Sequence, residues 1–96
     1  MLLEKVAKWQ LRKLVVARNK AAAKFEAIEV RYNYFLNISM LAIPSNADYQ
    51  TKIGLLRQRS TGLSKSNELL SSYLRAKRKL ENIDLKIDRL ERLLDL

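Results

Sequence analysis

The side chains that could do chemistry in this 96-residue sequence are almost all lysines, arginines and carboxylates. Histidine and cysteine are absent, so the commonest general base, the thiol nucleophile and the usual zinc ligands are missing. The carboxylates lie three or four residues from basic residues, which is the spacing of ordinary ion pairs along a helix. No nucleotide-binding, calcium-binding or metalloprotease motif occurs. We therefore expect a protein that is not an enzyme, with no catalytic residues, no metal site and no cofactor.

Positive charge is the strongest functional signal. The sequence has 19 basic and 10 acidic side chains, a net charge of +9, and the basic residues concentrate in residues 1–24 and 51–79. If the chain turns back near Pro44, these two segments lie side by side, and an anion bound across them relieves their mutual repulsion. The predicted contacts of an anionic partner are Lys8, Arg12, Lys13, Arg75, Lys77, Arg78 and Lys79.

Four interpretations of this charge stay open, of which attraction to a membrane surface is one. In the other three, the basic residues bind an acidic protein surface, hold the phosphates of a nucleic acid without reading its bases, or form a polar face that serves solubility alone. Trp9 lies beside Lys8, Arg12 and Lys13, and it either stacks on a base or packs into a helical seam. Nucleic-acid binding of this kind would be weakly sequence-specific and strongly salt-dependent.

Long helices must position these side chains, because the sequence holds only two glycines and one proline. Nothing interrupts a helix over residues 2–43, and Pro44 ends it. A turn over residues 44–46 leads into a second helical region over residues 46–96. The whole chain is read as one helical domain, residues 1–96.

An inner seam of apolar residues runs along the first helix at spacings of three and four. Arg18 occupies one of its positions, and Ser45 is expected to cap the second helical region with Asp48 in its first turn. The apolar members of the seam are Leu3, Ala7, Leu11, Leu14, Ala21, Phe25, Ile28, Tyr32 and Phe35.

Two seams of different register follow one another in the second helical region. Residues 59–68 separate them, are rich in serine and include Gly62, so this stretch is either a kink in one helix or a loop between two helices. Because the second region is longer than the first, its end is expected to overhang. The first seam contains Ile53, Leu56, Leu63, Leu70 and Leu74, and the second contains Leu69, Tyr73, Ala76, Leu80, Ile83, Ile87, Leu90 and Leu94.

No charged residue occurs between Arg31 and Asp48, and the stretch is rich in aromatic and aliphatic residues. One hairpin has a single inner face, which is too little to hide all of them. We expect the excess, together with the overhanging seam, to contact a second chain. The predicted interface consists of Tyr34, Phe35, Ile38, Leu41, Ile43, Tyr49, Leu55, Leu80, Ile83, Ile87, Leu90 and Leu94.

Pro44-Ser45-Asn46, followed closely by Tyr49-Gln50-Thr51-Lys52, resembles the interhelical turn of type III secretion needle subunits. The two parts are closer together here than in those subunits. Small hairpin chaperones of the same secretion systems are similar in size and in coiled-coil character. The resemblance implies a helical hairpin subunit or chaperone of such a system, and no functional residue is carried over from it.

These patterns predict an all-α fold: an antiparallel, coiled-coil-like hairpin of long helices that completes a helical bundle as a homo-oligomer. The predicted function is an adaptor, chaperone or assembly factor that binds a helical or acidic protein, or a second copy of itself. The alternative is a basic nucleic-acid-binding or architectural protein. Neither a signal peptide nor a membrane-spanning segment is visible, so we expect a cytoplasmic protein.

Overall fold

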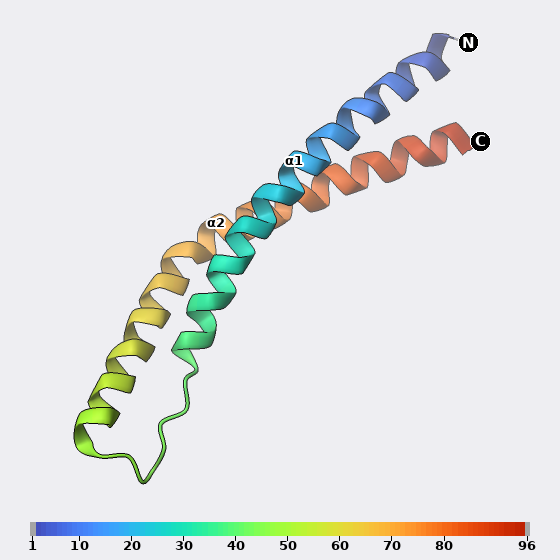
Figure 1. Cartoon of the computed structure of the whole chain (residues 1–96). Helices are drawn as coiled ribbons and strands as arrows, with labels where there is room; N and C mark the ends of the chain where they lie inside the picture. Colours follow the sequence, from blue (N-terminus) through green and yellow to red (C-terminus); the bar gives the residue numbers. More distant parts are fainter. Residues whose placement is uncertain (1, 96) are drawn as a thin grey trace. The chain divides into compact units, whose positions relative to one another are not determined.

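The computed structural model describes residues 2–95, which form two long helices. Helix α1 spans Leu2–Ser39 and helix α2 spans Tyr49–Asp95, and residues 40–48 connect them. The helices are antiparallel (Figure 1), which confirms the predicted all-α hairpin. Helix α2 passes through residues 59–68 without a break, so the loop considered for this stretch is absent.

The hairpin divides into two units. The terminal unit contains residues 2–26 and 74–95, and the loop unit is Ala27–Tyr73. Ala21 and Ile83 are buried in the terminal unit, and Gly62 and Ser66 are buried in the loop unit. Most other inward-facing residues stay half-buried, because two helices alone cannot enclose a side chain on all sides.

The inner seam of α1 is confirmed from Ala7 to Phe35. Its apolar members are buried or half-buried in the structure, whereas Arg18 is exposed. Leu3 does not belong to the seam, because its side chain is 85% exposed. Leu3 precedes Ala7 by four residues, and Ala7 precedes Leu11 by another four, which breaks the alternation of three and four that keeps a residue on one face.

Helix α2 has one inner seam, not two. The seam predicted from Leu69 onward continues toward the helix start through Ser66, Gly62 and Leu55 at unbroken spacing, with Arg59 at the remaining position. The other predicted seam is wrong for four of its five members, because these leucines point outward. Their side chains are exposed by 52% at Leu56, 54% at Leu63, 38% at Leu70 and 51% at Leu74.

At Gly62, helix α2 packs directly against the backbone of α1. A Cβ atom at this position would lie 2.7 Å from the Phe35 carbonyl oxygen, 2.7 Å from the Ser39 nitrogen and 2.9 Å from Cγ2 of Ile38. Because two of these atoms belong to the backbone, no side-chain adjustment makes room for a methyl group. Gly62 is therefore a helix-contact residue and not the helix breaker that its low propensity suggests.

Further from the connection in the same unit, large side chains replace the small ones. The rings of Tyr32 and Tyr73 stack with their centroids 4.7 Å apart and their planes inclined by 16°. Stacked aromatic pairs add to the free energy gained from burial alone. The inner seam therefore begins tight at Gly62 and widens to hold a tyrosine from each helix.

Helix α1 ends at Ser39, before the predicted boundary at residue 43. The Ser39 hydroxyl donates to the Leu36 carbonyl at 2.5 Å, and the Met40 N–H donates to the Asn37 carbonyl at 3.1 Å, closing a tighter last turn. Arg59 of α2 then donates from Nε to the Ser39 carbonyl at 3.3 Å. A cation at a helix C-terminus is favourable, because the terminal carbonyls carry partial negative charge.

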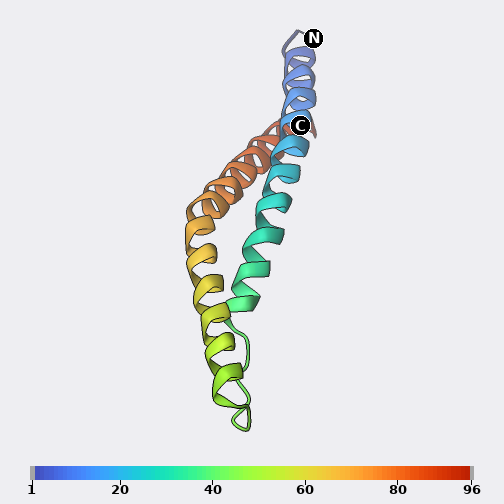
Figure 2. The same ribbon diagram turned by 60° about the vertical axis from the view of Figure 1, so that its left-hand side comes forward.

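The connection between the helices is longer than predicted. Residues 41–44 have no regular structure and run alongside the first turns of α2 (Figure 2), and a turn follows in which the Ala47 N–H donates to the Pro44 carbonyl at 3.2 Å. Helix α2 starts at Tyr49 with Asp48 as its cap, whose carboxylate accepts from the Thr51 N–H at 2.7 Å. The predicted cap at Ser45 is wrong, because Ser45 lies inside the turn.

Candidate interaction surface

Helix α1 carries a second line of apolar side chains on the face away from its inner seam. We call this line the outer stripe. In the terminal unit its successive members are four and three residues apart in turn. Lys13 and Lys20 are its only charged members there, and its four large apolar side chains are 43–79% exposed. The outer stripe of the terminal unit comprises Leu2, Val6, Trp9, Lys13, Val16, Lys20 and Ala23.

The outer stripe is bordered by positive charge. Among residues 2–24 the one carboxylate is Glu4, which accepts from Lys8 at 3.0 Å. Arg18 is also paired, because its Nε lies 2.5 Å from Oδ1 of Asp84. Of the basic side chains in residues 2–24, those that form no ion pair with any part of residues 2–95 are Lys5, Arg12, Lys13, Lys20 and Lys24.

Trp9 lies at the centre of this surface. Its side chain is 53% exposed, and the ammonium of Lys13 lies 3.9 Å from the centre of its ring. Such a cation–π contact holds the ring and the lysine together on one side of the helix. Packing of Trp9 into the inner seam, one of the two predicted roles, is therefore excluded by its position.

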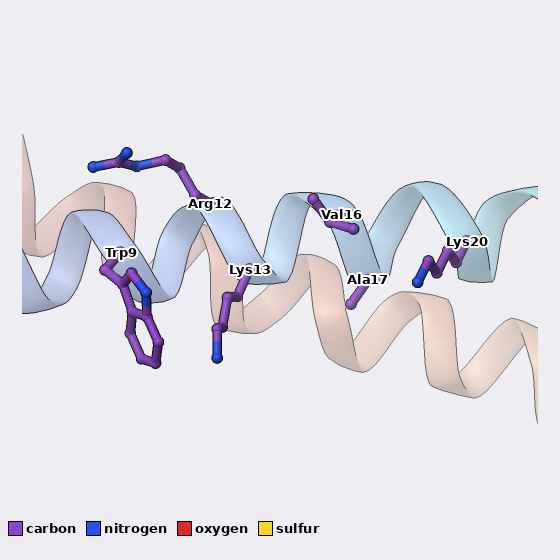
Figure 3. Close-up of a pocket in the computed structure, with 6 residues that line it drawn as sticks. All are labelled: Trp9, Arg12, Lys13, Val16, Ala17 and Lys20. Atoms are coloured by element: carbon purple, nitrogen blue, oxygen red, sulfur yellow. The ribbon is translucent and has the colours of Figure 1, made fainter.

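A shallow hollow follows Trp9 along the helix. All the residues that line it belong to α1, and Figure 3 shows Trp9 and Lys13 extending from one edge of the helix and Arg12 from the other. Lysine and arginine stems are apolar below their charged ends, so they extend the apolar floor that Val16 and Ala17 provide. The lining residues are Trp9, Arg12, Lys13, Val16, Ala17 and Lys20.

This arrangement fits the apolar side of another helix. In coiled coils, apolar side chains at heptad spacing form the contact between two helices. Charges of one sign beside them favour a partner helix with charges of the opposite sign. The spacing of three and four lets knobs from a docking helix enter between Val6, Trp9 and Val16. An amphipathic helix with acidic flanks therefore matches both the shape and the charge of the outer stripe.

The predicted cluster of seven basic residues does not form. A fold symmetric about Pro44 would place Arg18 opposite residue 70, but Arg18 lies beside Asp84, much further along α2. The segment of α1 that contains Lys8, Arg12 and Lys13 therefore runs alongside the last turns of α2, where acidic and basic residues are mixed. Lys8, Arg12, Lys13, Arg75, Lys77, Arg78 and Lys79 are all exposed, and their contact with an anionic partner stays a prediction.

The connection explains this shift. The five residues after Ser39, up to Pro44, are extended and each covers up to about 3.3 Å along the hairpin. The ten residues of α2 after Tyr49, up to Arg59, are helical and each covers about 1.5 Å, so the two segments have similar lengths. The contact of Arg59 with the Ser39 carbonyl shows the result, since helix pairing begins at Arg59 and not at Tyr49.

The predicted interface residues fall into three groups. Tyr34 and Tyr49 are strongly exposed, at 61% and 74%, and stay available to a second chain. Ile83 is buried within the single chain, so the expected overhang of the C-terminal seam is wrong: the first half of α1 covers it. The half-buried members are Phe35, Ile38, Leu41, Ile43, Leu55, Leu80, Ile87, Leu90 and Leu94.

The outer stripe was not found from the sequence, although its signal was present. A surface helix ordinarily has one apolar line, and the lysines at positions 13 and 20 interrupt the second line of α1. A count of every position spaced by three and four from Leu2 would have found it, because the same spacing continues in α1 at Ala27, Val30 and Tyr34.

Comparison with known proteins gives no further guide to this surface. No family model, curated protein or solved structure matches the chain significantly. The resemblance of residues 44–52 to the turn of needle subunits therefore stays a prediction. Within residues 2–95 neither helix has a stretch apolar enough to cross a membrane, and no cluster of three carboxylates suited to a metal ion occurs.

Proposed function

We propose that this protein is a non-enzymatic helical adaptor or chaperone, which binds an acidic amphipathic helix of another protein along the outer stripe of α1. The observation that carries the proposal is the exposure of Leu2, Val6, Trp9 and Val16 on the face of α1 away from α2. Exposed apolar surface of this regularity costs solubility unless a partner covers it.

Charge identifies the chemistry of that partner. Lys5, Arg12 and Lys24 border the stripe without an ion pair in residues 2–95, so a docking helix with Glu or Asp beside its apolar seam neutralises them. A basic helix would add repulsion to a chain whose net charge is already +9.

The test uses the single tryptophan of the chain as its reporter. A designed helical peptide with a leucine seam and glutamate flanks should shift the emission of Trp9 to shorter wavelength as the indole leaves water. The matched peptide with lysine in place of each glutamate should produce no shift. Equal binding of the two peptides would contradict the charge argument.

Two variants locate the binding face. Val16→Glu should abolish the shift, because it places a carboxylate in the middle of the outer stripe. Leu85→Glu is the control, since Leu85 of α2 is 54% exposed against 55% for Val16 and lies on the other helix. If both variants bind the acidic peptide like the original chain, the outer stripe is not the binding surface.

A second candidate function is non-specific binding of nucleic acid. It is favoured by the exposure of Trp9 beside Arg12 and Lys13, since an aromatic ring flanked by cations is a common platform for an unpaired base. Stacking quenches tryptophan emission, and phosphate contacts make the affinity fall steeply with salt. A single-stranded oligonucleotide that quenches Trp9 at low salt, with the acidic peptide inactive, would favour this function over the first.

A further inference from the structure

Three of the leucines that point outward from α2 lie at intervals of seven residues. Leu56, Leu63 and Leu70 all belong to the loop unit, and their side chains are 52%, 54% and 38% exposed. Ser60 and Asn67 fill the positions between them, so this line, which we call the α2 stripe, contains no charged residue.

We propose that the α2 stripe binds a second copy of this chain in an antiparallel arrangement with its two-fold axis at Leu63. A chain of net charge +9 repels its own copies, so self-association needs a surface that brings no like charges together. The outer stripe of α1 fails this condition, because Lys13 and Lys20 of both copies would meet. The α2 stripe satisfies it.

The spacing of the leucines suits a two-fold axis. In the antiparallel arrangement Leu63 faces Leu63 of the second copy, and Leu56 of each copy faces Leu70 of the other. The same patch then serves both copies, as closed dimers require. Every leucine of the stripe is covered, and none is left beyond the end of the contact.

Charge at the two ends of the stripe selects this direction. Arg57 lies at one end and forms no ion pair within residues 2–95, while Glu68 lies at the other and has only a loose contact of 4.0 Å with Lys65. The antiparallel arrangement brings the arginine end of one copy to the acidic end of the other. A parallel arrangement would bring Arg57 near Arg57 and Glu68 near Glu68.

Molar mass in solution provides the first test. By light scattering the full chain should have twice its monomer mass of 11.2 kDa, and Leu63→Glu should return it to the monomer with its helix content unchanged. Leu85→Glu, at the same 54% exposure but in the terminal unit, should stay dimeric. A monomeric original chain at high micromolar concentration, or a dimeric Leu63→Glu variant, would overturn the proposal.

Single cysteines test the direction, because the natural chain has none. Leu63→Cys should form a disulfide-linked dimer by itself. Leu56→Cys and Leu70→Cys should each fail to do so, since equivalent residues lie roughly 21 Å apart at 1.5 Å per residue, but should cross-link when mixed. Self-linkage of Leu56→Cys would show a parallel pair and overturn the two-fold axis at Leu63.

The cysteine series also covers the case in which Leu63→Glu does not fold, since these positions are exposed and cysteine is smaller than leucine. Leu85→Cys is the matched negative control. The two surfaces can be judged separately: Val16→Glu should keep the dimer mass, and Leu63→Glu should keep the Trp9 response to the acidic peptide. Loss of one property without the other shows which proposal has failed.

Discussion

At the scale of single residues, the two glycines of α2 have opposite roles. Gly62 lies against the backbone of α1, whereas nothing comes within 4 Å of a Cβ atom placed at Gly54. Both residues reduce helix propensity by a similar amount. Only at Gly62 does the missing side chain permit a contact, so the same residue type is a requirement at one position and a weakness at the other.

Alanine substitution should separate these roles. Gly54→Ala should stabilise the fold by about 1 kcal/mol, because it raises helix propensity without a clash. Gly62→Ala should destabilise it by about 1–3 kcal/mol, because the methyl group forces the helices apart. Urea unfolding followed by circular dichroism measures both changes. Equal stabilisation by the two substitutions would show that α1 and α2 do not touch at Gly62.

Asp48 gives the fold a defined pH dependence. Hydrogen bonds from the Thr51 hydroxyl and the Thr51 N–H lower the pKa of the Asp48 carboxyl below its usual value. Because the folded pKa is the lower one, the stabilising effect is complete above the unfolded pKa of about 4 and is lost as pH falls through the folded pKa.

Asp48→Asn keeps a capping oxygen but removes the charge, so it isolates this effect. The thermal midpoint of the variant should lie below that of the original chain at neutral pH, and the gap should close as pH falls below about 4. Melting curves across this range provide the measurement. A gap that does not change with pH would mean that the carboxylate contributes only as a cap.

At the scale of the helices, the ion pair between Arg18 and Asp84 reports the register of the terminal unit. Arg18→Asp and Asp84→Arg should each reduce stability by up to about 1 kcal/mol, as expected for a half-exposed pair, and the double exchange should recover most of the loss. A double-mutant cycle by chemical unfolding tests this. The same cycle between Arg18 and residue 70, the partner expected from symmetry about Pro44, should show no coupling.

Much of the hairpin could be predicted from the sequence. The inner seam of α1 and the part of the α2 seam from Leu69 onward were correct, because large apolar residues at spacings of three and four leave little choice. The inward positions of Gly62 and Ser66 were not predicted, since these small residues permit a close helix contact but are not large apolar residues. The register between α1 and α2 was not predicted either, because the sequence pattern does not decide whether residues 40–44 are helical or extended.

Those two misses account for the errors at the candidate sites. Without Gly62 in the seam, Leu56 and Leu63 were assigned inward, and the α2 stripe was hidden. Because the connection was taken to be short, the basic residues of segments 1–24 and 51–79 were predicted to lie together. The outer stripe was not predicted for a different reason. A surface helix normally has one apolar face, whereas α1 has two.

At the scale of the whole molecule, salt should act in opposite directions on the two proposed contacts. Self-association through the uncharged α2 stripe should strengthen with ionic strength, because screening reduces the repulsion between two chains of charge +9. Binding of the acidic peptide should weaken over the same range, because its attraction is screened. Sedimentation and Trp9 fluorescence in a common salt series measure both. Parallel responses would mean that one surface serves both contacts.

The connection between the helices has a consequence for how the gene can change in length. One extended residue between Met40 and Pro44 covers about the distance of two helical residues between Tyr49 and Arg59. A deletion of one codon in the first segment should therefore be compensated by a deletion of two in the second, while Gly62 keeps its place against Phe35. Relatives of this protein, when aligned, should vary in length here in that ratio.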